Sequence, residues 1–122
     1  MKAQKAEILN QLPRHGWDVT PVEDYELEWW ADEMWVLEST WSPVESRAYI
    51  TFLVDPQIPH SRTRKKGEAI WAVMVSPTKP RAWQSSEGSF TLSIGQGWEK
   101  RLPTFFEHLA ELRNYKGSIS GA

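Results

Sequence analysis

Cysteine is absent from this chain of 122 residues. Disulfide bonds and thiolate metal ligands are therefore excluded, and the absence fits a reducing compartment. No apolar run approaches the ~20 residues that a membrane span requires. The N-terminal stretch is also too short and too charged for the core of a signal peptide. We therefore expect a cytoplasmic protein that makes no membrane contact.

The chain also lacks an excess of charge of either sign. Its 14 basic and 16 acidic residues give a formal net charge of -2. Proteins that bind nucleic acids or acidic membranes normally carry a net basic face, so the balance argues against both classes. The length is typical of one domain. We expect a single domain over residues 1–122, with a frayed tail at about 117–122.

Signatures of catalysis and of metal binding are missing too. The three histidines, His15, His60 and His108, are too far apart in sequence to form a ligand pair. No serine lies in a G-x-S-x-G turn, and no glycine-rich phosphate loop is present. We therefore predict no metal site and no cofactor, and a non-catalytic function is favoured over an enzyme.

Tryptophan, by contrast, is abundant, with 8 residues in the chain. A buried indole hides about 150–250 Å² of surface and needs a partner for its N–H group. Most of these residues should therefore build the core. Some should lie at a surface, where one edge of the ring can contact water or a partner.

Hydrophobic periodicity predicts the element order α-β-β-β-β-α. Lys2 to Leu12 has one apolar side and is followed by Pro13, which indicates a short helix. Residues 13–26 are expected to form a polar connector. The four predicted strands are 34–41, 47–54, 68–75 and 89–94. A final helix is predicted to begin near Pro103 and to end at Gly117.

The segment from residue 27 to residue 41 allows two interpretations. Alternation at a period of two indicates a strand with one apolar face. A helix over 23–34 would instead pair Trp30 with Met34, which are four residues apart. The strand is favoured from Met34 onward, and the choice stays open before it.

Short loops between strands favour antiparallel neighbours. The predicted fold is therefore α+β, a two-layer sandwich in which a four-stranded antiparallel meander carries the N- and C-terminal helices. The pattern does not show which sheet face the helices cover. The other face would present Trp30 and Met34 to a protein partner or to a second copy in a homodimer.

Two loop regions supply further candidate binding residues. Arg47, Arg81 and Trp83 are predicted near one end of the sheet, where arginine beside tryptophan suits recognition of an anion or a peptide. In the alternative interpretation, Trp83 caps the core. The 60–66 loop is basic and could bind an anion or nucleic acid, or could form a solvated tip. Its candidate anion-binding residues are Arg62, Arg64, Lys65 and Lys66.

An enzyme of unknown reaction is the alternative to a binding module. Glu33 is flanked by apolar residues, and desolvation there would favour the protonated form that a general acid needs. Glu38 or His108 could complete such a site in a cleft between helix and sheet. One carboxylate does not make a site, however. The sequence therefore favours a protein-interaction module that binds through an aromatic-rich sheet face.

Overall fold

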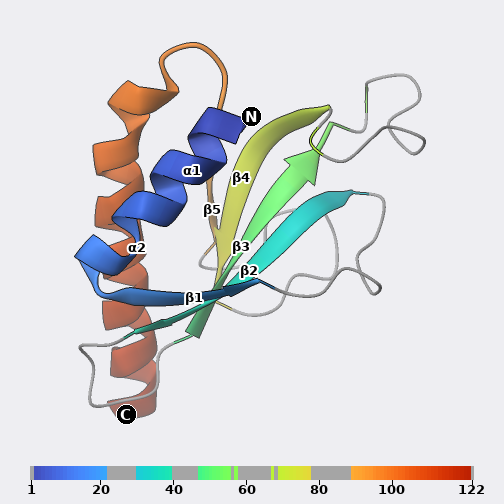
Figure 1. Cartoon of the computed structure of the whole chain (residues 1–122). Coiled ribbons are helices and arrows are strands. Elements are labelled where there is room, and N and C mark those ends of the chain that lie inside the picture. The colour runs from blue at the N-terminus through green and yellow to red at the C-terminus, as the bar shows by residue number, and fades with distance from the viewer. Residues whose placement is uncertain are drawn as a thin grey trace.

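The computed structural model describes residues 2–21, 30–39, 47–55, 57, 67, 69–77 and 89–121. These residues form an α+β fold (Figure 1). Along the chain, a helix comes first, the strands of an antiparallel sheet follow, and a second helix comes last. The elements are α1 (Lys2–Gln11), the 3-10 helix η1 (Pro13–His15), β1 (Trp17–Pro21), β2 (Ala31–Ser39), β3 (Arg47–Val54), β4 (Ile70–Ser76), β5 (Phe90–Ser93) and α2 (Trp98–Gly121). Among these helices, none is long and apolar enough to cross a membrane.

The five described strands follow one another in the order β1-β2-β3-β4-β5. The predicted meander of four strands is therefore wrong in strand number, although each of the four predicted strands is present. The competing helix over 23–34 is wrong at its C-terminal end, because β2 begins at Ala31. Every neighbouring pair is antiparallel, as the short connections predicted.

The additional strand, β1, lies within the stretch that was expected to be a polar connector. Gly16 adopts a left-handed φ of 85°, which glycine tolerates, so the chain turns directly after η1. The Trp17 backbone N–H then donates to the Leu12 carbonyl at 3.1 Å. Trp17 itself is only 1% exposed. A five-residue strand with a proline at its end carries a weak periodic signal, and an edge position tolerates that proline.

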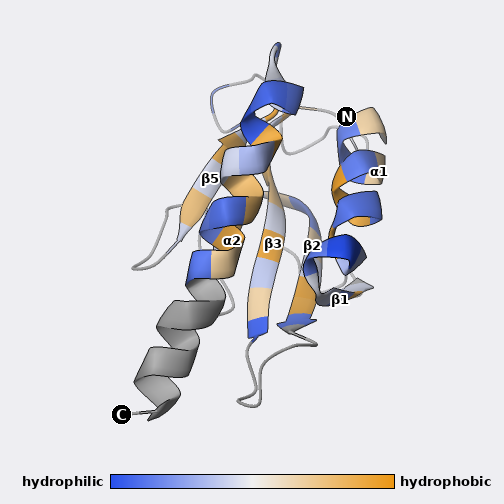
Figure 2. Ribbon diagram, turned by 90° about the vertical axis from the view of Figure 1, so that its left-hand side faces the viewer, coloured by the Kyte–Doolittle hydropathy of each residue, from blue (hydrophilic) through white to orange (hydrophobic). Residues whose placement is uncertain are grey.

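Both helices lie on the same side of the sheet (Figure 2). Alternate residues of each strand point toward them, as strand geometry requires. The helices and the turn after α1 contribute Ile8, Leu12, Leu102, Phe105, Phe106 and Leu109 to the main core. The strands contribute Trp17, Trp35, Leu37, Ala48, Ile50, Phe52, Val73, Val75 and Leu92. This core fixes how α1 and α2 sit beside each other.

The C-terminal helix begins earlier than predicted, at Trp98 rather than near Pro103. Gly97 has a φ of 84°, and the Trp98 N–H donates to the Gly95 carbonyl at 3.1 Å, which closes a tight turn before the helix. The Arg101 guanidinium group then donates to the backbone oxygens of Ser93, Gly95 and Gln96. The helix also continues past Gly117 to Gly121.

The opposite face of the sheet is buried as well. Its described side chains Met34, Thr51, Leu53, Ala72 and Met74 are at most 2% exposed in the single chain. Trp30 is 6% exposed and belongs to a second apolar cluster with Ala31, Leu53, Ala72 and Met74. The expected homodimer stays a prediction, but covering these side chains requires no second copy.

Candidate functional site

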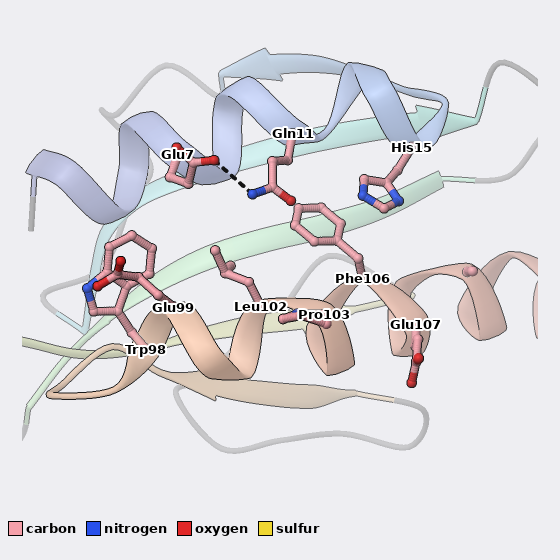
Figure 3. A pocket seen from close by; sticks show the side chains of 10 residues that line it. Glu7, Gln11, His15, Trp98, Glu99, Leu102, Pro103, Phe106 and Glu107 are labelled. Carbon is pink, nitrogen blue, oxygen red and sulfur yellow. Dashed lines mark hydrogen bonds between the residues drawn. The ribbon is translucent and has the colours of Figure 1, made fainter.

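A groove of about 870 Å³ lies between α1 and α2 (Figure 3). This volume is in the range of ligand-binding sites. Glu7 and Gln11 come from α1, and His15 comes from η1. The α2 side is formed by Trp98, Glu99, Leu102, Pro103, Phe106, Glu107 and Ala110. We call this feature the α1–α2 groove.

Helical spacing explains why these residues line one surface. Glu7 and Gln11 are four residues apart, so they share one face of α1. The α2 residues recur at intervals of three and four, so they form one stripe along α2. Pro103 and Ala110 have small side chains, which leaves space between the two helices.

The floor of the groove is apolar and aromatic. Leu102 and Phe106 are 5% and 4% exposed, and both belong to the main core. The His15 ring lies flat against Phe106, with centroids 4.2 Å apart and an interplanar angle of 5°. Phe106 in turn meets Phe105 edge-on at 5.1 Å. These ring contacts hold the floor in one arrangement.

The charged rim of the groove is acidic. Glu7, Glu99 and Glu107 line it, whereas none of the ten described lining residues is lysine or arginine. The Gln11 amide donates to Glu7 Oε1 at 2.8 Å. Glu99 and Glu107 form no ion pair or hydrogen bond with their side chains among the described residues. In Figure 3, the carboxylate of Glu107 points away from α1.

The one histidine that lines the described groove is oriented by a ring contact. His15 is stacked on Phe106, and within the described part of the chain no carboxylate hydrogen-bonds to its ring. A general base normally needs such an orienting partner. The described residues also contain no group of three or more histidine, aspartate or glutamate side chains that could hold a metal ion.

None of the predicted binding residues is among the described lining of the groove. Arg47 begins β3, and its guanidinium group pairs with Glu38 at 3.0 Å on an exposed surface. Trp30 and Met34 are buried against the sheet. The other six candidates lie outside the described residues, namely Arg62, Arg64, Lys65, Lys66, Arg81 and Trp83. Their binding roles stay predictions.

The three residues considered for an enzyme site do not converge. Glu33 faces α1, where Lys5 Nζ lies 3.0 Å from its Oε1 and the Trp35 indole N–H donates to its Oε2. Glu38 points to the opposite sheet face, because it follows Leu37 of the main core. The His108 ring on α2 meets Phe90 edge-on at 5.3 Å. Glu33 thus has a structural role, which the sequence also allowed.

No family model, curated protein or solved structure gives a significant match to this chain.

Proposed function

We propose that this chain is a cytoplasmic, non-catalytic binding module and that the α1–α2 groove is its contact surface. The observation that carries the proposal is an aromatic floor, open between two helices, beside carboxylates that form no ion pair within the described part of the chain. The sequence favoured an interaction module that binds through a sheet face. The proposed contact surface moves to the helices, because Trp30 and Met34 of that sheet face are buried.

Preorganisation supports this choice of surface. The His15–Phe106 stack and the edge-on contact between Phe106 and Phe105 already fix the rings that a partner would touch. A rigid contact surface loses little side-chain entropy on binding, so more of the contact energy appears as affinity. Aromatic side chains in such positions often dominate the energy of an interface.

Filling the groove tests the proposal. Ala110 is exposed and lines the groove, so Ala110→Trp should occupy the space of a ligand without disturbing the core. Ala6 is exposed on α1 but does not line the groove, so Ala6→Trp is the matched control. Peptides would first be selected against the whole chain from a random display library. We expect Ala110→Trp to weaken the selected peptides at least about tenfold, as steric exclusion from a hot spot would.

The control variant should bind within about twofold of the unmodified chain, since its substitution lies on a surface that the proposal does not use. Thermal unfolding of both variants checks that each is folded. Equal affinity for Ala110→Trp and for the unmodified chain would place binding outside the groove. A selection that yields no binding peptide would also count against the proposal.

A further inference from the structure

We infer that the α1–α2 groove takes an extended basic segment of a partner protein, in which lysine or arginine alternates with apolar residues. This inference rests on the proposed function and specifies the chemistry of its ligand. Three properties of the groove carry it: the charge of the rim, the length of the channel, and the alternation of acidic and apolar positions along it.

The charge of the groove lining predicts a positively charged ligand. Three glutamates and no lysine or arginine are present among the described lining residues. The carboxylates of Glu7 and Glu99 lie toward the same end of the groove, and neither is part of an ion pair in the described chain (Figure 3). An acidic channel with a low-dielectric wall attracts cations and repels anions. Charge complementarity of this kind sets partner choice.

Length favours a peptide over a compact ligand. The α2 side of the groove runs from Trp98 to Ala110, twelve residues along the helix. At 1.5 Å per residue this is about 18 Å. An extended peptide advances about 3.3 Å per residue, so five or six residues span the groove. A small amine would fill only one end of a channel of this length.

The order of side chains along the groove matches alternating basic and apolar residues. At one end, the indole of Trp98 lies beside Glu99, so a lysine stem can cover the ring while its ammonium group meets the carboxylate. Leu102 and Pro103 follow in the middle and offer an apolar contact. Glu107 lies further toward the other end and offers a second, weaker position for a cation, because its carboxylate points away from α1.

The test uses isothermal titration calorimetry with three capped hexapeptides. The basic probe is Ac-Lys-Leu-Lys-Phe-Lys-Leu-NH₂, and the other two carry glutamine or glutamate in place of lysine. The groove variant is Glu7→Gln with Glu99→Gln. The control is Asp18→Asn with Glu38→Gln, which removes the same charge from two exposed residues that face each other across β1 and β2, on the sheet face opposite the helices.

The basic probe should bind at least about tenfold more tightly than the glutamine probe, and 0.5 M salt should remove most of this difference through screening. Neutralising Glu7 and Glu99 should weaken the basic probe about fivefold, the sum of two exposed charge pairs. The control should stay within about twofold. Glu107→Gln should have a smaller effect than the Glu7 and Glu99 pair, because its carboxylate points away from α1.

Two kinds of failure are distinguishable. Equal or tighter binding of the glutamine or glutamate probe, still abolished by Ala110→Trp, would overturn the basic chemistry and leave the groove as the binding surface. Binding of the basic probe that is insensitive to Ala110→Trp would overturn both, since the contact would then lie elsewhere. If the groove variant and the control weakened the basic probe equally, binding would depend only on the net charge of the chain. This result would also overturn the inference.

Discussion

Lys5 connects α1 to β2 through two carboxylates. Its Nζ lies 2.8 Å from Asp32 Oδ2 and 3.0 Å from Glu33 Oε1, and 4.8 Å from the centre of the Phe52 ring. The Asp32 side chain is fully buried and also accepts a hydrogen bond from the Gly67 N–H at 2.7 Å. A buried carboxylate is costly unless it is paired, so the ion pair with Lys5 offsets part of the cost of burying Asp32.

Replacing Lys5 with methionine should therefore be strongly destabilising. Lys5→Met keeps the length of the side chain but removes the ammonium group that lies against the buried Asp32 carboxylate. We expect the free energy of unfolding in urea to fall by about 3 kcal/mol. Arg47→Met removes a cation from an exposed pair and should cost less than about 1 kcal/mol. Similar losses for the two variants would show that the Lys5 pair is as weak as a surface pair.

At the level of elements, hydrophobic patterning identified most of the sheet. The predicted 47–54 strand coincides with β3 (Arg47–Val54), where alternate residues are apolar, and the third predicted strand overlaps β4, which is rich in apolar β-forming residues. β1 was missed because it is five residues long and ends at Pro21. The predicted start of α2 near Pro103 is too late in the chain. The first turn of the helix is stabilised by Arg101, which binds carbonyl groups that only the folded turn brings together.

Two tryptophans test the position of β1 in the core. Trp17 on β1 is 1% exposed and lies in the main cluster, whereas Trp71 on β4 is 42% exposed. Trp17→Ala should lower the free energy of unfolding by about 3–5 kcal/mol, as expected for a large buried ring. Trp71→Ala removes the same atoms from a partly solvated site and should cost less than half as much. Equal losses in urea unfolding would contradict the packing of β1 under the helices.

At the scale of the whole molecule, the candidate site comes from tertiary packing. Glu7 and Gln11 lie near the start of the chain, whereas Trp98 and Phe106 lie near its end. Periodicity within one segment predicts which residues share a face, but it does not predict which two helices lie side by side. The core residues of α2 could therefore be predicted from the sequence, while the groove beside α1 could not.

The central claim is that ligands bind between α1 and α2, and an NMR titration of the ¹⁵N-labelled chain with the basic hexapeptide tests it most directly. We predict that the largest amide and indole shift changes fall on groove residues, above all Gln11, His15, Trp98 and Phe106, and that they saturate together. Shift changes concentrated at Arg47 or on the buried sheet face around Met34, with the groove signals unmoved, would contradict the claim.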